Sequence, residues 1–224
     1  MSRREFAERI AAGLSGWFQQ LAAQELDSQV GEDAARVELV RTISSLRQYV
    51  PETSKRPTNW PQGTRKRIDI AVMGRSENAA GWYGAIELKW PAKSFDVAAT
   101  RQKIVEDAVR IIFTDTANLN ARFVVLGGTK ASLDLLFDKK HPNTQEKEDQ
   151  RNAFCDLFSR DTNNATGRLT NDLLNKHFPD FGDRVPQTVF NGWSRRLQTD
   201  LVATASSDIG KTEQGRVYVW QCSR

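Results

Sequence analysis

The chain has 224 residues, of which 39% are hydrophobic and 27% are charged, and its formal net charge is +4. This composition is typical of a soluble globular protein, and a chain of this length needs no disulfide or metal staple to fold. Its two cysteines, Cys155 and Cys222, match no zinc spacing and fit a reducing compartment. The N-terminus has no apolar signal core and no apolar run approaches membrane-spanning length, so we expect a cytoplasmic protein.

The first part of the chain is predicted to form two helices. Apolar residues recur at helical spacing over residues 5–28, and a second helix is expected over 32–49. Glu32 lies three positions before Ala35, at the start of the apolar stripe of that second helix, whereas Glu38 lies off the stripe. We therefore expect Glu32 to be the glutamate that faces inward.

A basic segment follows, with its charges at Lys55, Arg56, Arg65, Lys66 and Arg67. Its prolines, asparagine and glycine favour a loop over a helix. A basic loop that leads into a strand with a carboxylate suits a polyanionic substrate. The alternative is a solvated loop in a mildly basic protein, and charge alone favours that alternative.

Two short apolar runs, residues 67–72 and 82–90, are predicted to be strands joined as a hairpin through the polar residues 74–81. Asp69 lies in the first strand and Glu87 in the second. Alternation along the strands places each carboxylate on a largely apolar face. Because an isolated buried charge is very costly, each carboxylate needs a partner.

Two partners are compatible with these residues. Mg²⁺ or Mn²⁺ would suit them, since hard cations prefer oxygen ligands. Lys89, two positions after Glu87, could instead form a simple ion pair with a carboxylate at the end of the strand. The first alternative gives a small divalent-metal site with the Lys89 ammonium beside it. Such an arrangement is suited to hydrolysis of a phosphodiester.

The rest of the chain completes the predicted architecture. A helix is expected over 97–113, and the continuous apolar run 121–128 indicates a strand buried on both faces. The terminal residues 216–222 alternate like an edge strand. Together these elements predict an α/β protein with a mixed sheet flanked by helices.

We expect a single domain over 1–224. Its core would span about 28–137, and about 138–224 would form a C-terminal elaboration. No internal repeat or low-complexity segment interrupts the chain.

Asp69 followed by the triplet Glu87-Leu88-Lys89 resembles the motif of the PD-(D/E)xK nuclease superfamily, the restriction-endonuclease-like fold. The likeness extends from about Glu32 to Gly128 and includes the helix that carries Gln102 and Asp107. Ile68 stands where the family often has proline. The C-terminal third carries no signature of the family.

The resemblance implies that Asp69 and Glu87 bind Mg²⁺ or Mn²⁺, with the Leu88 carbonyl as a further ligand. It implies that Lys89 orients or helps to deprotonate the attacking water and offsets charge on the scissile phosphate. Glu32 would contact the metal directly or through water. The alternative for Glu32 is an ordinary acid at a helix N-terminus, where the helix dipole favours negative charge.

The resemblance further implies a nuclease that acts on DNA in restriction, phage defence or DNA processing, and it allows a homodimer. The basic segment would then contact phosphates near the site. The alternative is a non-catalytic module on the same fold that binds nucleic acid or protein. Divalent-metal binding separates the two.

Overall fold

The computed structural model describes residues 1–26, 30–55, 67–74, 82–91, 94–113, 121–139, 148–161, 166–170, 172–173, 176, 197–209 and 212–223. The elements in chain order are α1 (Arg3–Ala23), α2 (Glu32–Ser45), β1 (Tyr49–Lys55), β2 (Ile68–Gly74), β3 (Trp82–Lys89), α3 (Val97–Phe113), β4 (Ala121–Thr129), α4 (Lys130–Phe137), α5 (Glu148–Leu157), β5 (Thr166–Leu169), β6 (Leu197–Ile209) and β7 (Thr212–Ser223). None of the helices in these described segments is long and apolar enough to cross a bilayer.

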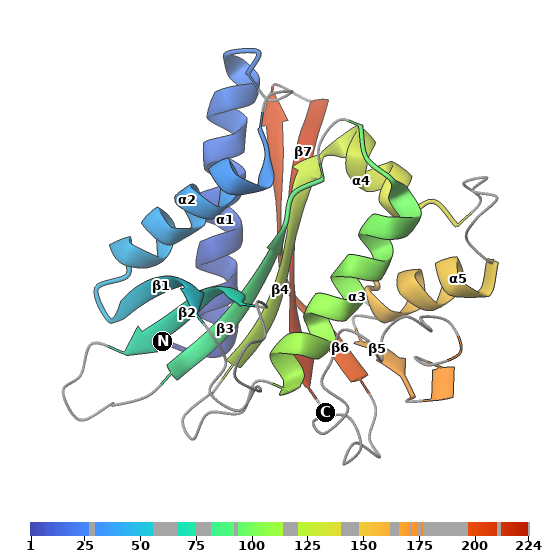
Figure 1. Ribbon diagram of the computed structural model, residues 1–224. Helices are drawn as coiled ribbons and strands as arrows, with labels where there is room; N and C mark the ends of the chain where they lie inside the picture. Colours follow the sequence, from blue (N-terminus) through green and yellow to red (C-terminus); the bar gives the residue numbers. More distant parts are fainter. Residues whose placement is uncertain are drawn as a thin grey trace.

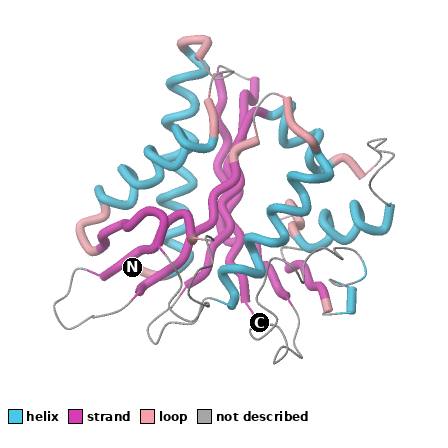
Figure 2. The backbone as a smooth tube through the Cα atoms, in the orientation of Figure 1, coloured by secondary structure: helices cyan, strands magenta, loops and turns pink. Residues whose placement is uncertain are grey.

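A seven-stranded mixed sheet in the order β1-β2-β3-β4-β7-β6-β5 runs through the molecule (Figures 1 and 2). β3 and β4 are parallel, and the other neighbouring strands are antiparallel. Parallel neighbours need a crossover connection, and α3 lies between β3 and β4 in the chain to supply it. The protein is therefore α/β with a mixed sheet, as predicted.

Helices cover both faces of this sheet, as Figure 1 shows with α1 behind it and α3 in front. On the α1 face, the side chains of Phe6, Ile10 and Leu14 pack with strand residues such as Ile70 and Ile86. On the other face, α3, α4 and α5 pack with the opposite sides of the same strands. The seven apolar strand residues that anchor the predicted strands are all fully buried, namely Ile68, Ile70, Val72, Ile86, Leu88, Val124 and Leu126.

The second helix is shorter than the sequence pattern predicts. α2 ends at Ser45, and Tyr49–Lys55 forms β1, an edge strand paired with β2. Tyr49 is buried, with its ring centroid 4.6 Å from that of Tyr83 and 5.4 Å from that of Phe6. Pairing and aromatic packing therefore override the local helical pattern. Pro51 fits the edge position, where a missing backbone donor is tolerated.

The C-terminal strand is not at an edge, which corrects the expectation from its alternating sequence. β7 lies between β4 and β6. Val217 and Val219 are buried on the α1 face, whereas Tyr218 and Trp220 are buried on the α3 face. The alternation thus separates aliphatic from aromatic packing rather than core from solvent. Strands from the C-terminal third continue the same sheet as β1–β4.

Candidate active site

The pairing of β2 with β3 brings Asp69 and Glu87 together. The antiparallel register pairs Ala71 with Ala85 and Ile70 with Ile86, and the next pair in that register is Asp69 with Glu87. Residues directly opposite each other on such strands share a face, with Cβ atoms about 5 Å apart. The Asp69 carboxylate also accepts a hydrogen bond from the Leu88 backbone N–H at 2.9 Å.

Lys89 points its ammonium group into the same region. Its Nζ lies 2.9 Å from Asp107 Oδ2 and 3.4 Å from Glu32 Oε2. It also donates to the backbone oxygen of Leu88 at 3.2 Å. The Lys89 side chain is only 16% exposed, so its contacts with carboxylates are shielded from most of the solvent.

The first turns of α2 contribute Glu32 and Arg36, which lie four residues apart and so share a helix face. Arg36 Nη2 lies 3.0 Å from Glu32 Oε1 and 3.4 Å from Asp69 Oδ1. Glu38 instead pairs with Arg41 at 3.5 Å on the same helix. The structure thus brings Glu32, and not Glu38, next to Lys89, although the Glu38 side chain is the less exposed of the two, at 14% against 32%.

Helix α3 supplies Asp107 and Arg110 from the other side. Arg110 donates to both carboxylate oxygens of Glu87, from Nε at 2.8 Å and from Nη2 at 2.6 Å. Arg110 Nη2 also lies 2.7 Å from Asp107 Oδ1. Glu87 is fully buried, so this two-pronged contact is the main compensation for its charge.

Sequence reasoning gave no role to three of these residues, Arg36, Asp107 and Arg110. On α3, Asp107 and Arg110 border the apolar stripe that includes Ala108 and Ile111. Two charged residues of opposite sign that border a buried stripe and lie three positions apart indicate an ion pair at the edge of the core, and this signal is present in the sequence. Their partners on β3 could not be identified without the position of α3.

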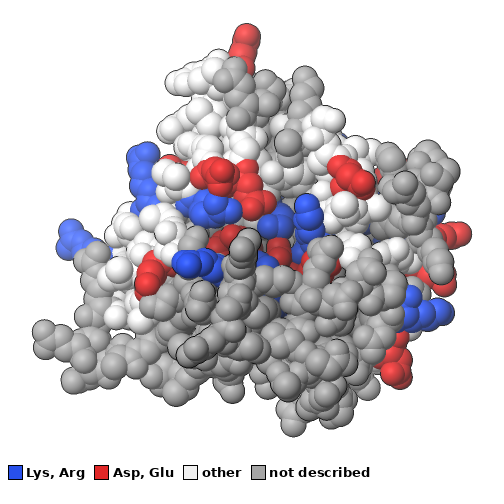
Figure 3. Space-filling view, in the orientation of Figure 1, with Lys and Arg blue, Asp and Glu red and all other residues white. Residues whose placement is uncertain are grey.

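Seven residues therefore form what we call the ion-pair cluster: Asp69, Arg36, Glu32, Lys89, Asp107, Arg110 and Glu87, named in the order of their contacts. Acids and bases alternate along this series. Figure 3 shows basic and acidic side chains gathered in the middle of the face that carries α2 and α3.

The series begins and ends on an acid, so within it four carboxylates face three bases; the 93% exposed Asp33 also pairs with Arg36 but lies outside the series. Its two ends, Asp69 and Glu87, are the pair that lies opposite across β2 and β3. Asp69 pairs with Arg36, and Glu87 pairs with Arg110. The two ends of the series are therefore neighbouring carboxylates, and each is paired with a different arginine.

The electrostatics of the cluster reflect this crowding of acids. Burial raises the pKa of Glu87 well above its usual value, and the neighbouring charges of Asp107 and Asp69 raise it further against the opposing effect of Arg110. Burial also raises the pKa of Glu32, with Asp69 adding to the rise and Lys89 opposing it.

The pKa of Lys89 is raised as well, which for a lysine favours the charged form. Burial alone lowers the pKa of its ammonium group, but the carboxylates of Asp107, Glu32 and Asp69 outweigh burial and raise that pKa. In this arrangement Lys89 carries a full positive charge at neutral pH. It acts as a fixed cation, and a lowered pKa would require a further cation beside it.

The described residues contain no group of three or more His, Cys, Asp or Glu side chains arranged to hold a metal ion. Mg²⁺ does not require one, because it usually binds one or two carboxylates and keeps several waters or substrate phosphates. Asp69 and Glu87 supply two carboxylates, and each ionised carboxylate has about four lone-pair sites. The two Arg110 bonds leave part of the Glu87 carboxylate free, so these donors fit a hard cation.

The predicted basic segment is only partly placed. Arg56, Arg65 and Lys66 lie outside the described residues. Arg67 is exposed, and Lys55 at the end of β1 pairs through its backbone with Ile68. Both ends of the segment therefore adjoin Asp69, which follows Ile68 directly.

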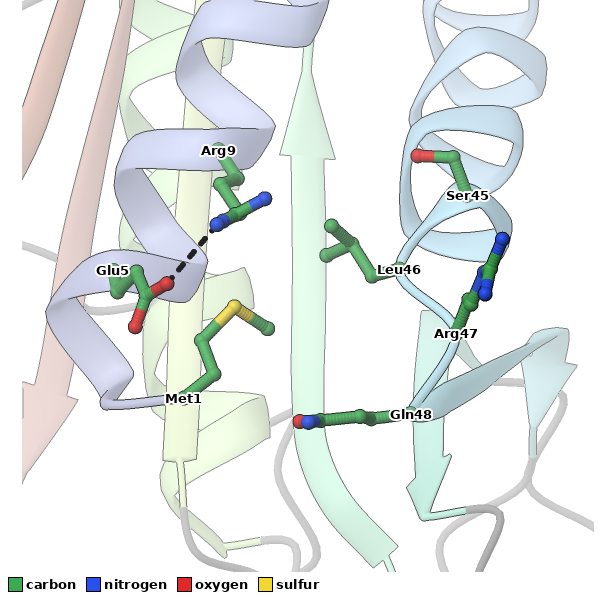
Figure 4. Close-up of a pocket in the computed structure, with 7 residues that line it drawn as sticks. All are labelled: Met1, Glu5, Arg9, Ser45, Leu46, Arg47 and Gln48. Carbon is green, nitrogen blue, oxygen red and sulfur yellow. Dashed lines mark hydrogen bonds and ion pairs between the residues drawn. The ribbon is translucent and has the colours of Figure 1, made fainter.

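Two hollows lie elsewhere on the surface. One of about 430 Å³ lies between the start of α1 and the turn after α2, with Glu5 paired to Arg9 at its wall (Figure 4). Another of about 640 Å³ lies beside α5 and β5 and includes Arg160 and Arg168. Neither shares a lining residue with the ion-pair cluster.

Comparison with known proteins gives no match to a protein-family model, to a curated protein or to a solved structure.

Proposed function

We propose that the protein is a Mg²⁺-dependent nuclease of the restriction-endonuclease-like fold that hydrolyses phosphodiester bonds of DNA. One observation carries the proposal: Asp69 and Glu87 lie opposite each other across two strands, and the carboxylates of Asp69 and Asp107 both act on the Lys89 ammonium beside them. Two neighbouring carboxylates supply the oxygen ligands that a hard divalent cation prefers.

The order of elements supports the same proposal. α2 carries Glu32, the antiparallel pair β2 and β3 carries Asp69 and the Glu87-Leu88-Lys89 triplet, and α3 leads to β4, which is parallel to β3. These are the elements over which the sequence resembles PD-(D/E)xK nucleases, and they follow one another in the same order. This order of elements, together with the closeness of Asp69, Glu87 and Lys89, supports the proposal.

The proposal assigns Asp69, Glu87 and the Leu88 carbonyl as metal ligands. When bound, the metal would lower the pKa of a coordinated water and neutralise charge on the phosphate. Hydrolysis joins the water oxygen to phosphorus, breaks one bridging P–O bond, and yields a phosphate monoester and a hydroxyl group. Such chemistry depends mainly on positioning and on charge stabilisation.

Lys89 and Glu32 supply that positioning from the protein. Lys89 carries positive charge and donates hydrogen bonds, so it stabilises negative charge on the scissile phosphate and orients the attacking water. Glu32 lies next to Lys89 and its side chain is 32% exposed. Its raised pKa makes it a better proton acceptor than an ordinary glutamate, which suits it to take the proton of that water.

Substrate binding is proposed for the basic segment that includes Lys55, Arg56, Arg65, Lys66 and Arg67. The segment leaves β1 and rejoins β2 beside Asp69. Lysines and arginines there would contact DNA phosphates next to the scissile bond, which gives affinity without sequence selection.

A non-catalytic binding module on the same fold is the second candidate, and one observation favours it. Arg110 already compensates both oxygens of Glu87, so the carboxylate is stable without a metal. Under this alternative the ion-pair cluster only fastens α2 and α3 to the sheet, and no divalent cation binds between Asp69 and Glu87.

Cleavage of supercoiled and linear DNA with Mg²⁺, with Mn²⁺ and with a chelator tests the proposal. We expect cleavage that requires the divalent ion and is abolished in Asp69→Asn. Asp134→Asn is the matched control, because Asp134 is an exposed acid on α4 outside the cluster. If metal-dependent cleavage were absent from the wild-type protein, or persisted in Asp69→Asn, the proposal would be wrong.

A further inference from the structure

Asp107 is the acid that holds Lys89 most closely. Its Oδ2 lies 2.9 Å from Lys89 Nζ, whereas the nearest Glu32 oxygen lies 3.4 Å from the same atom. The Asp107 side chain is 8% exposed and that of Glu32 is 32% exposed. Solvent therefore screens the Asp107 contact less than the Glu32 contact.

Asp107 is itself rigidly held. Its other oxygen, Oδ1, lies 2.7 Å from Arg110, which is three residues further along α3. Arg110 in turn donates two hydrogen bonds to Glu87. The helix is anchored by the buried side chains of Ile104, Ala108 and Ile111, among others.

A lysine side chain needs such support because its four-carbon stem is flexible. The two oxygens of Asp107 hold one base each, so Asp107 fixes the Lys89 ammonium relative to Glu87 on the same strand. Asp107 Oδ2 is buried, and its ion pair with Lys89 Nζ at 2.9 Å offsets the charge on that oxygen.

We propose that Asp107 is a positioning residue for the proposed reaction: it holds the Lys89 ammonium at the place where the scissile phosphate and the attacking water meet. This inference rests on the nuclease function proposed above. Asp107 acts through Lys89 and touches neither substrate nor metal. Its loss lets Lys89 move toward Glu32 and solvent.

Steady-state cleavage by Asp107→Asn tests the proposal. Misplacement of a catalytic group by about 1 Å can lower the rate by about 10²-fold, so we expect a loss of kcat on that order with KM little changed. Asp107→Glu keeps the charge and should retain more of kcat than Asp107→Asn. Asp134→Asn on α4 should behave as the wild-type protein.

A double-variant cycle separates positioning from a general structural effect. If Asp107 acts through Lys89, Asp107→Asn should lower kcat no further once Lys89→Met is present. Equal losses from Asp107→Asn in both backgrounds would overturn the proposal, and so would wild-type kcat in Asp107→Asn. If Asp107→Asn does not fold, Asp107→Glu in the two backgrounds provides the same comparison.

A second readout does not depend on activity. An ammonium group held in a buried ion pair exchanges protons slowly with water and gives a resolved ¹H–¹⁵N signal, which Lys89→Met identifies by its loss. We expect the Lys89 signal in the metal-free wild-type protein and in Asp134→Asn, and its loss in Asp107→Asn. An unchanged signal in Asp107→Asn would refute the positioning role, whereas an inactive wild-type protein with the expected signals would refute only the nuclease proposal.

Discussion

Replacement of Arg110 by methionine should destabilise the protein strongly. Arg110 supplies two hydrogen bonds, at 2.8 and 2.6 Å, to a carboxylate that has no exposed surface. Removal of one partner of a buried ion pair leaves the other charge uncompensated, at a cost of about 3–5 kcal/mol in the free energy of unfolding. For a domain of this size, each kcal/mol lowers Tm by about 2–4 °C, so the expected fall is about 6–20 °C.

The loss should depend on pH with a definite sign. The pKa of Glu87 is raised in the folded protein from an ordinary value of 4.5, chiefly by burial, and removal of Arg110 raises it further. An acid with a higher pKa in the folded state binds its proton more tightly when folded. The contribution of Glu87 to the free energy of unfolding is therefore most favourable at low pH. It declines as pH rises from about 4.5 toward the pKa of Glu87 in the folded protein. Arg110→Met should therefore lose less stability at pH 5 than at pH 8.

Thermal and urea unfolding at these two pH values, with and without Mg²⁺, provide the measurement. A divalent cation between Asp69 and Glu87 replaces part of the missing charge, so Mg²⁺ should raise Tm more in Arg110→Met than in the wild-type protein. Arg4→Met is the control: Arg4 is 78% exposed in its pair with Glu8, and surface changes of this kind stay within about 0.5 kcal/mol. An Arg110→Met protein as stable as Arg4→Met at pH 8 would refute the reasoning.

Three further predictions follow from the site and the sheet. Glu32→Ala should lower the cleavage rate more than Glu38→Ala, because of these two glutamates only Glu32 contacts Lys89. The reverse order in a cleavage assay would show that Glu38, and not Glu32, acts in the reaction. In DNA-binding titrations, the double variant Arg65→Ala with Lys66→Ala should flatten the slope of log affinity against log salt by roughly 2, because each lost phosphate contact contributes about 0.9. An unchanged slope would indicate that the basic segment is a solvated loop that does not contact DNA. Gly127→Ala should destabilise the fold by about 1–3 kcal/mol in urea unfolding, because a Cβ there would lie 2.2 Å from a tryptophan ring; wild-type stability would show that the ring can move aside.

Much of the central fold was predictable because its signals are local. Short runs of apolar residues mark the strands around Asp69 and Glu87 and the buried strand over 121–128. Such short runs are typical of strands in a buried sheet. The helix over 97–113 has bounds that match α3. β1 was not predictable in this way, since Tyr49 joins the sheet through its contacts with Phe6 and Tyr83, which are distant in sequence.

The site was predictable only where one strand pattern or one helix face carries the information. Alternation placed Asp69 and Glu87 on apolar faces, and helical spacing selected Glu32 over Glu38. The ion pairs with Arg110 and Asp107 depend on how α3 crosses from β3 to β4, which no local pattern encodes. Tertiary placement therefore added three of the seven residues of the cluster and showed that acids outnumber bases within it.

The position of a bound Mn²⁺ ion tests the central claim most directly. Crystals grown or soaked with Mn²⁺ give an anomalous signal that locates the ion without reference to activity. We predict one peak between the carboxylates of Asp69 and Glu87, beside the Leu88 carbonyl, and no peak there in Asp69→Asn crystals. A wild-type map with Arg110 still bound to Glu87 and no Mn²⁺ at that position would contradict the account and leave the cluster as a purely structural network.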